Sequence, residues 1–234
     1  MSNQPRNNLG RQPAKDTRIH FGDLRRLRPI SRSFGFDRGQ PIDRYYIERF
    51  LDKNSVHIEG HVLEIGENHY TNQFGGDKVT RSDVLDLPER NNPNATITAD
   101  LTRADQLPSG IFDCIIFTQT LQFIYDMRAA VATLHRLLKP GGVLLATVPT
   151  CSQICRFDMD RWGDYWRFTN AAVQRLLGDA FGPNNVAVTS HGNVLVAISF
   201  LQGLSAHELE PHELDYHDPD YQLVITARAL KETK

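Results

Sequence analysis

The feature that most constrains this chain is the alternation, from residue 61 onward, of short β-branched runs with longer helical patterns. Strand candidates occupy residues 61–65, 78–84, 95–99, 112–117, 143–148 and 221–229. Residues 126–138 carry apolar side chains at Val131, Leu134 and Leu137, the spacing of an amphipathic helix, and the Lys-Pro-Gly-Gly run at 139–142 then predicts a turn into the next strand. Strands that alternate with helices in this way predict an α/β fold, with a mostly parallel sheet covered by helices on both faces.

The 234 residues are enough for one large domain, which we divide into three parts. Residues 1–33 are expected to form a disordered or extended basic arm, because they are polar and rich in arginine. Residues 34–55 are expected to form a helical lid segment, and residues 56–234 the core domain. Within the core, Thr169 predicts the start of a helix that runs to residue 181. The apolar run 193–204 fits either a buried helix or a strand.

Composition excludes several classes of protein. The formal net charge is −2, and outside the arm no basic stripe is present to bind nucleic acid. Three cysteines are too few for a disulfide framework, and no apolar run approaches the ~20 residues that span a bilayer. His207, His212 and His217 share no helical face, so no metal site is expected. We therefore expect a cytoplasmic protein without a transmembrane segment or a nucleic-acid partner.

Carboxylates occur at the ends of three consecutive strand candidates, where open parallel sheets bind their ligands. Glu64 lies in the last turn of the first strand, Asp83 ends the second and Asp100 follows the third. A phosphate site would instead need several glycines and a Lys or Arg. Carboxylates suit ribose hydroxyls, an exocyclic amine or a cationic ligand, so the sequence predicts a ligand of that kind at this edge.

Several motifs at regular spacing point to a known family. They are Val-Leu-Glu-Ile-Gly at 62–66, the acids Asp83 and Asp100, Phe-Asp-Cys-Ile-Ile-Phe at 112–117 and the Leu-Lys-Pro-Gly-Gly run at 138–142. Together they resemble class I, Rossmann-like, S-adenosylmethionine-dependent methyltransferases over residues 60–230. Residues 38–48 and 158–169 are similar to methyltransferase domains associated with glycosyltransferases and glycan biosynthesis. The resemblance implies a three-layer fold, a seven-stranded sheet with an antiparallel last strand, and S-adenosylmethionine as the cofactor.

The resemblance also implies roles in the loop after the first strand. Gly66 would let the backbone approach the methionine part of the cofactor, and Glu64 would help to hold its amino group. Glu67 and Asn68 belong to the same cofactor-binding loop. The family usually has glycines where this chain has Asn68 and Tyr70. Asn tolerates a left-handed backbone but Tyr does not replace glycine, so the loop is expected to run differently at Tyr70.

Further roles implied by the resemblance fall after the next three strands. Asp83 would accept hydrogen bonds from the ribose hydroxyls, and Asp100 from the adenine amine. Leu101 would pack on the adenine ring. Thr118 and Gln119 would line the sulfonium end of the cofactor. Taken alone, Asp83 and Asp100 could equally be turn residues, since Asp is common after strands.

The segment 156–169 is the richest candidate for binding the methyl acceptor. It contains both tryptophans of the chain beside several carboxylates and arginines, a combination that suits a sugar. Methyl transfer to an alcohol needs a base that takes the hydroxyl proton. The candidate catalytic residues are Asp158 and Asp164, with Tyr165 as a positioning group and His69 as a further candidate base. The alternative is that the tryptophans cover the edge of the core while the charges pair at the surface.

The lid segment contains four side chains that suit closure over the cofactor carboxylate or the substrate. These are Arg38, Arg44, Tyr45 and Tyr46. A helix packed on the edge of the sheet would explain the tyrosines equally well.

The function that these patterns favour is O-methylation of a sugar or glycan-type hydroxyl, with a small-molecule or glycan acceptor. A homodimer is left open. Two alternatives remain: a non-catalytic cofactor-binding or scaffold protein, and a methyltransferase acting on another small molecule. A nucleic-acid methyltransferase is disfavoured, because Phe-Thr-Gln-Thr at 117–120 lacks the Pro-Pro-aromatic run that positions flipped bases.

Overall fold

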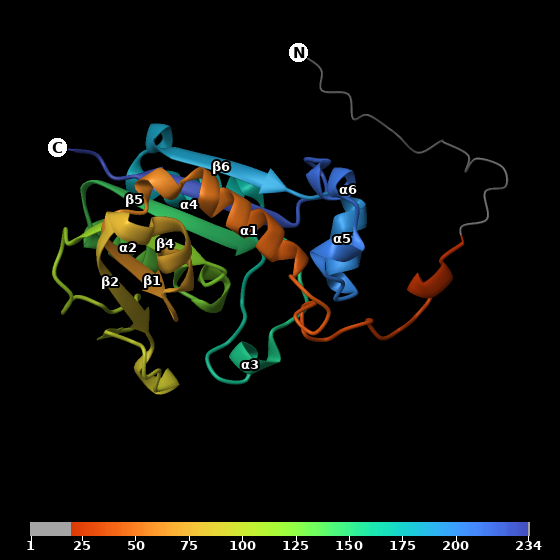
Figure 1. Ribbon diagram of the computed structural model, residues 1–234. Coiled ribbons are helices and arrows are strands. Elements are labelled where there is room, and N and C mark those ends of the chain that lie inside the picture. Colours follow the sequence, from red (N-terminus) through yellow and green to blue (C-terminus); the bar gives the residue numbers. More distant parts are fainter. Residues whose placement is uncertain (1–19, 234) are drawn as a thin grey trace, which may run out of the picture.

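The computed structural model describes residues 20–233, and the first nineteen residues of the predicted basic arm lie outside this part. A seven-stranded sheet in the order β3-β2-β1-β4-β5-β7-β6 forms the centre (Figure 1). The strands are β1 (Gly60–Ile65), β2 (Val79–Asp86), β3 (Ile97–Thr98), β4 (Phe112–Thr118), β5 (Leu138–Pro149), β6 (Val186–His191) and β7 (Val224–Leu230). Strands β1 to β5 pair in parallel, and β7 runs antiparallel to β5 and β6. The predicted sheet, with its antiparallel last strand, is confirmed.

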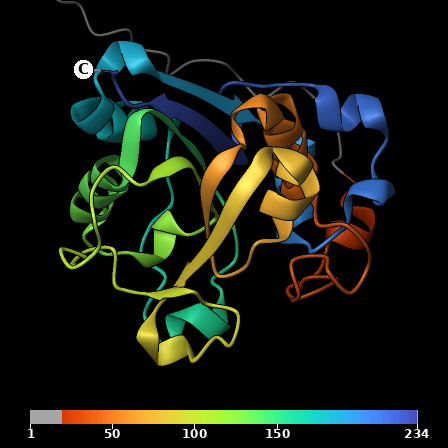
Figure 2. The same ribbon diagram turned by 60° about the vertical axis from the view of Figure 1, so that its left-hand side comes forward.

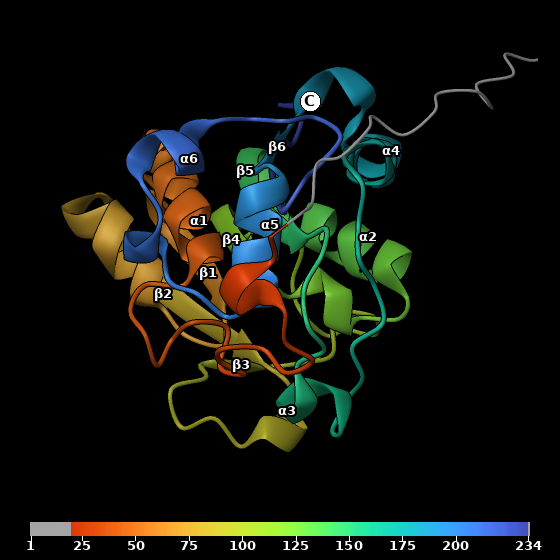
Figure 3. The same cartoon turned by 90° about the vertical axis from the view of Figure 1, so that its right-hand side faces the viewer.

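Helices cover both faces of this sheet, which gives three layers. The helices are α1 (Ile42–Lys53), α2 (Met127–Leu137), α3 (Arg156–Met159), α4 (Asn170–Phe181), α5 (Val194–Leu201) and α6 (Pro211–Asp215). In Figure 3 the sheet lies between α1 and α6 on one side and α2 and α4 on the other. Leu134 of α2 and Leu177 of α4 are buried in one apolar core, and Ile47 of α1 and Val196 of α5 in the other. The α/β architecture therefore has a separate core on each face.

Side-chain caps begin three of these helices. Asp126 accepts a hydrogen bond from the backbone N–H of Ala129 before α2, and Thr169 accepts one from Ala172 before α4. Asn193 caps α5 in the same way. Such caps satisfy N–H groups that have no partner within the helix. For residues 193–204 the sequence left a helix and a strand open. The structure has the helix α5 there, which Asn193 caps.

Three predicted bounds differ from the structure. Strand β2 continues to Asp86, because Leu85 and Asp86 still pair with β3. Strand β3 itself contains only Ile97–Thr98 rather than residues 95–99. The Lys-Pro-Gly-Gly run lies inside β5 rather than in a turn, at an irregular start where the register with β4 shifts. Gly141 takes a φ of +80° there, which favours glycine.

The segment before α1 packs along the segment that follows α5. The backbone N–H groups of Ile30 and Ser31 both donate to the carbonyl of Gln202, and Pro41 forms an isolated bridge with Ser205. The described chain is thus already held by the core at residue 30. None of the helices in residues 20–233 has the length and apolar character needed to cross a membrane.

Candidate functional site

Two adjoining cavities open at the carboxyl ends of the parallel strands. The β2–β3 cavity has a volume of about 210 Å³, and its lining includes Ile65, Asp86, Arg90, Asp100, Leu101, Gln119, Phe123, Asp158 and Trp162. The β4–β5 cavity has a volume of about 280 Å³, and its lining includes Phe36, Asp43, Arg44, Gln119, Gln122, Phe123, Asp158, Asp164 and Arg167. Gln119, Phe123 and Asp158 line both cavities. The two therefore meet beside the end of β4, and one ligand can extend from the first into the second.

A wall of the β2–β3 cavity is built by α3 and the short helical turn η5 (Pro88–Arg90), which lie side by side in Figures 2 and 3. The guanidinium of Arg90 stacks 5.1 Å from the ring centre of Trp162, and its Nε lies 3.4 Å from a carboxylate oxygen of Asp86. The indole N–H of Trp162 in turn donates to Asp158 over 3.0 Å. The wall thus joins residues from two distant parts of the sequence.

Asp86, rather than Asp83, is the carboxylate at the end of β2. The prediction that Asp83 ends the second strand is wrong, because the strand continues for three more residues. The buried Asp83 carboxylate is bonded to His61 at 2.6 Å and to the hydroxyl of Thr96 at 2.7 Å. Burial raises the pKa of Asp83, but these hydrogen bonds outweigh it and leave the pKa below its usual value. Asp83 is therefore hydrogen-bonded within the sheet, and it lines neither cavity.

Asp86 was not predicted, although its position meets the criterion that was applied to Asp83. Its Oδ1 accepts from the backbone N–H of Leu87, and its Oδ2 accepts from the side-chain amide of Asn92, both over 2.8 Å. The apolar pair Val84 and Leu85, directly before Asp86, could have indicated the longer strand. The acid at the real strand end lines the β2–β3 cavity.

Asp100 and Leu101 lie where the sequence placed them, after β3 in the same cavity. One Asp100 oxygen accepts from the backbone N–H and the hydroxyl of Thr102, over 2.9 and 2.7 Å, and the other lies 3.3 Å from Arg103. Burial raises the pKa of Asp100, while these hydrogen bonds outweigh it and lower the pKa. The residue is therefore a carboxylate at neutral pH, with Leu101 buried beside it.

The loop after β1 is organised around the buried side chain of Glu64. One Glu64 oxygen accepts from the backbone N–H of Tyr70 over 3.2 Å, and the other accepts from the N–H and hydroxyl of Thr71, both over 2.7 Å. Tyr70 is buried in the core beneath α1. Both oxygens of Glu64 are thus engaged in holding the turn that follows β1.

The remaining residues of this loop flank that turn. Gly66 adopts a φ of +80°, and a Cβ there would meet only the end of the Arg90 side chain, at 3.8 Å. Glu67 is exposed, and the side-chain amide of Asn68 lies 3.5 Å from the hydroxyl of Ser82. Gly66 therefore provides the open backbone that the sequence predicted, next to a side chain of the β2–β3 cavity.

Gln119 follows β4 with a left-handed backbone, which is uncommon for a residue other than glycine. Its φ is +46°, and its backbone N–H donates to the carbonyl of Thr147 over 2.9 Å. Its own carbonyl accepts from the side chain of Gln122 over 2.8 Å. Thr118 precedes it as the last residue of β4 and is half-buried. Such conformations cost of order 1–3 kcal/mol and cluster at functional sites, and this one lines both cavities.

The segment 156–169 does reach the cleft, but its two acidic candidates differ in their surroundings. Asp164 is buried and forms two hydrogen bonds with Arg167, of 2.6 and 3.0 Å, and it also accepts from the N–H of Cys155. Asp158 lines both cavities, with one oxygen accepting from Trp162. Asp164 is therefore a partner that fixes Arg167, whereas Asp158 keeps an oxygen for a ligand.

Tyr165 and His69 do not line either cavity. The exposed Tyr165 donates its hydroxyl to the carbonyl of Trp162 and packs edge-on against Tyr125. His69 is exposed and lies against the ring of Tyr70. The structure thus separates both residues from the junction of the two cavities.

Three buried polar atoms without a hydrogen-bond partner belong to residues of the β4–β5 cavity. They are Oδ1 of Asp43, Oε1 of Gln122 and Nε of Arg167. Buried polar atoms are almost always paired, and an unpaired one requires an explanation. Two are acceptors and one is a donor, so a ligand with both hydroxyl-type donors and acceptor oxygens would satisfy all three.

Of the four side chains predicted to close the lid, only Arg44 lines the cleft. Arg38 pairs with Glu208, and Tyr46 donates to the buried carbonyl of Leu214 over 2.7 Å. The hydroxyl of Tyr45 donates to Asp215, also over 2.7 Å. Arg38, Tyr45 and Tyr46 thus fasten α1 to the C-terminal segment, which corresponds to the packed-helix alternative.

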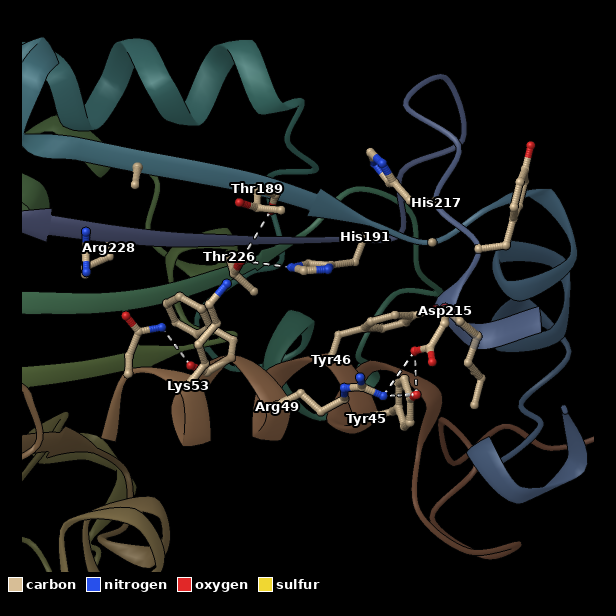
Figure 4. Close-up of a pocket in the computed structure, with 16 residues that line it drawn as sticks. Tyr45, Tyr46, Arg49, Lys53, Thr189, His191, Asp215, His217, Thr226 and Arg228 are labelled. Atoms are coloured by element: carbon tan, nitrogen blue, oxygen red, sulfur yellow. Dashed lines mark hydrogen bonds and ion pairs between the residues drawn. The ribbon is translucent and has the colours of Figure 1, made fainter. Parts of the chain in front are cut away.

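A larger cavity, of about 410 Å³, lies between α1 and the strands β6 and β7 (Figure 4). His191 stacks on Tyr46 there, with ring centres 5.4 Å apart, and its Nε2 lies 2.9 Å from the hydroxyl of Thr226. The pKa of His191 is lowered to about 4. Burial is the main cause, and the positive charges of neighbouring residues lower it further. None of the five parallel strand ends lines this larger cavity, so the cavity is not part of the cleft.

Histidine and acidic side chains do not gather into a metal site anywhere in residues 20–233. His207 lies 3.2 Å from the hydroxyl of Ser205, and His217 lies 3.2 Å from that of Ser190. No histidine is among the residues that line the two cavities of the cleft.

Comparison with known proteins gives a family for most of the chain. A family model described as "Methyltransferase domain" matches residues 27–176, which is more than half of the sequence and includes every residue of the cleft discussed above. Among curated protein sequences no significant match is found.

Solved structures with this fold have low sequence identity to the chain. A SAM-dependent methyltransferase from Archaeoglobus fulgidus aligns with a TM-score of 0.53 and 12% identity, over 80% of this chain and 94% of that one. A SAM-dependent methyltransferase from Thermotoga maritima, described as a possible histamine N-methyltransferase, has a TM-score of 0.52 and 15% identity over 84% and 95%. The N-methyltransferase NodS from Bradyrhizobium japonicum, in complex with S-adenosyl-L-homocysteine, has a TM-score of 0.50 and 16% identity over 87% and 94%. At such identities the likeness concerns the fold.

Proposed function

The chain belongs to the methyltransferase domain family, and from this premise we propose that it transfers the methyl group of S-adenosylmethionine to a hydroxyl of a sugar or glycan-type acceptor. The observation that carries the proposal is the meeting of two cavities at Gln119, Phe123 and Asp158. One cavity has the carboxylates that suit an adenosine, and the other has the unpaired polar atoms that suit a hydroxylated acceptor. Their junction is where a methyl group would pass between the two ligands.

The β2–β3 cavity fits the adenosine part of the cofactor. We assign to Asp86 the role of ribose partner that the resemblance implied for Asp83, because Asp86 lies at the end of β2 and lines the cavity. Asp100 is proposed to accept from the adenine amine, and Leu101 to pack against the ring. Gln119 and Thr118 are proposed to border the sulfonium end. When bound, the cofactor supplies a methyl group that is activated by the positive charge on its sulfur.

The β4–β5 cavity is proposed to hold the acceptor. Arg167 has a buried Nε that can donate, and Gln122 has a buried Oε1 that can accept, so a hydroxyl group satisfies either one. Asp164 keeps the guanidinium of Arg167 in place through two hydrogen bonds. The rings of Phe36 and Phe123 offer flat apolar surfaces to the faces of a sugar. These contacts would hold one acceptor hydroxyl near the junction.

Asp158 is proposed as the base. Its Oδ1 accepts from the indole of Trp162, which leaves Oδ2 to take the proton of the acceptor hydroxyl. Asp158 would take the proton that the acceptor hydroxyl loses when its oxygen receives the methyl group from the cofactor sulfur. Asp164 is disfavoured as the base because both of its oxygens are already hydrogen-bonded. Positioning and proton transfer are the two contributions that the protein makes to such a displacement.

The test is transfer of a labelled methyl group from S-adenosylmethionine to a panel of free sugars, sugar nucleotides and amine acceptors. We expect transfer to a sugar hydroxyl, and we expect Asp158→Asn to reduce kcat by about a hundredfold or more, as loss of a general base does. The matched control is Asp160→Asn, an exposed acid two residues away that pairs with Arg156. Transfer to amines alone would replace the sugar hypothesis with another small molecule. Binding of S-adenosylhomocysteine with no transfer to any acceptor would favour a non-catalytic protein.

A further inference from the structure

A cofactor with an amino-acid end needs a partner for its ammonium group, and Glu64 lines neither of the two cavities. Both Glu64 oxygens accept hydrogen bonds from Tyr70 and Thr71, within a side chain that is 2% exposed. The loop after β1 has therefore turned its acid inward, consistent with the tyrosine that stands in place of a glycine. Another carboxylate must serve the ammonium if the cofactor binds.

Asp43, in the first turn of α1, has a carboxylate oxygen to spare. Its Oδ1 is buried without a hydrogen-bond partner, and the residue lines the β4–β5 cavity. Its Oδ2 lies 3.5 Å from a guanidinium nitrogen of Arg44. An unpaired buried carboxylate oxygen is costly, and a cationic ligand group would remove that cost.

Arg44 is the neighbouring cation in the same cavity. Besides the contact with Asp43, its guanidinium lies 5.9 Å from the ring centre of Phe36. The guanidinium therefore keeps N–H groups that are free to bind a carboxylate. The side chain remains 26% exposed, so a ligand in the cavity can reach it.

This pair lies beside the loop that follows β1. Burial raises the pKa of Tyr70 to about 12, and the charges of Arg44 and Asp43 act on the same phenol. Tyr70 also shares an apolar core with Ile42, the first residue of α1. The start of α1 thus comes close to the strand end at which the methionine part of the cofactor is expected.

We propose that Asp43 and Arg44 bind the amino-acid end of S-adenosylmethionine, with Asp43 accepting from the α-ammonium and Arg44 pairing with the α-carboxylate. This assignment rests on the proposed function. Adjacent side chains of opposite charge complement a zwitterion, because each ligand charge meets a partner of the opposite sign. The same contacts supply the hydrogen bond that Asp43 Oδ1 lacks. In this assignment α1, rather than the loop after β1, binds the amino-acid end of the cofactor.

The electrostatics of Asp43 agree with this placement. Burial raises the pKa of Asp43, and the charge of Arg44 together with two backbone N–H groups lowers it without cancelling the effect. A bound ammonium would favour the ionised carboxylate. Asp43 is therefore suited to pair with a cation that arrives with the ligand.

The test compares two ligands by isothermal titration calorimetry: S-adenosylhomocysteine, and 5′-methylthioadenosine, which has the adenosine and sulfur but no amino-acid end. In Asp43→Asn and in Arg44→Gln, we expect the affinity for S-adenosylhomocysteine to fall about tenfold to a hundredfold. The affinity for 5′-methylthioadenosine should stay within about threefold of the unmodified protein. Charge-matched controls on the same helix are Asp52→Asn, at an exposed position, and Arg49→Gln, whose partner is Asp215.

Each other outcome has a definite meaning. Equal losses for both ligands, or no loss for either, would overturn the assignment of the zwitterion to this pair. Failure of the unmodified protein to bind either ligand would instead count against the proposed function. If Asp43→Asn does not fold, Arg44→Gln alone decides the matter, because its partly exposed side chain tolerates replacement.

Discussion

At the level of single residues, the two acids of β2 show how surroundings separate a structural from a functional carboxylate. Asp83 and Asp86 are both buried, yet Asp83 contacts His61, Thr96 and Arg81 inside the fold. Asp86 borders the cavity at the end of the strand. Their roles can therefore be distinguished by replacing each in turn.

We expect Asp86→Ala to weaken binding of S-adenosylhomocysteine by about 1–3 kcal/mol, since ribose hydroxyls would lose a charged acceptor. Asp83→Ala should leave that affinity nearly unchanged while lowering the free energy of unfolding by about 1–3 kcal/mol, because His61 and Thr96 lose their partner. Calorimetric titration and urea denaturation measure the two quantities. A weaker affinity in Asp83→Ala than in Asp86→Ala would restore the original assignment.

The sequence alone could not show that Asp83 is hydrogen-bonded inside the sheet while Asp86 lines the cavity. The strand was predicted over residues 78–84, which made Asp83 the acid at its end, and a buried charge inside a strand is uncommon. Asp43 escaped prediction for a similar reason, since the cavity that it lines is completed by Phe200 and Leu223, which are distant in the sequence. Arg44 was named as a lid residue because a charge near an aromatic cluster is visible in the sequence.

At the level of elements, the strands and helices were largely predictable and their ends were not. The β-branched runs gave six strands of the sheet, because period and length together separate strand from helix. The Lys-Pro-Gly-Gly run predicted a turn, but parallel pairing of Leu138 with Phe112 draws it into β5. Such long-range pairing is absent from any local pattern.

The position of α1 illustrates the same dependence. The helix carries Asp43 and Arg44 at one end, and the C-terminal segment fixes its flank through Tyr46, Tyr45 and Arg38. Elements nearly 170 residues away thus set the geometry of the cleft. The hydroxyl of Tyr46 is the buried member of this set, and its acceptor is the carbonyl of Leu214.

We expect Tyr46→Phe to lower the free energy of unfolding by about 1–3 kcal/mol, because the buried Leu214 carbonyl is left without a donor. Tyr45→Phe is the control: the exposed hydrogen bond to Asp215 that it removes should cost at most about 1 kcal/mol. Urea denaturation of both variants gives the comparison. Equal losses would show that the Tyr46 hydroxyl does not fasten the helix.

At the level of the whole molecule, stability should respond to mild acid. His191 has a pKa of about 4 in the folded protein against an ordinary 6.5, so the unfolded chain binds its proton more readily. Between these values the free energy of unfolding should fall as the pH falls, by up to roughly 3 kcal/mol for this group. His57 and His135, whose pKa values burial also lowers, act in the same direction.

The measurement is urea denaturation at several pH values from 7 to 4.5, above the range in which most carboxylates titrate. His191→Gln should flatten the dependence on pH, whereas replacement of the exposed His212 by Asn should keep it. An unchanged slope in His191→Gln would show that this histidine is protonated as easily in the folded state as in the unfolded one.

The place of β7 in the sheet has a consequence for how the molecule is made. This strand follows all the others in the chain, yet it lies between β5 and β6 rather than at a border. During synthesis, the N–H and C=O groups along one edge of β5 therefore remain unpaired until β7 has been made. The nascent protein is consequently most prone to aggregate in the interval after β5 and before β7 is made, and a chaperone acting in that interval would protect it best.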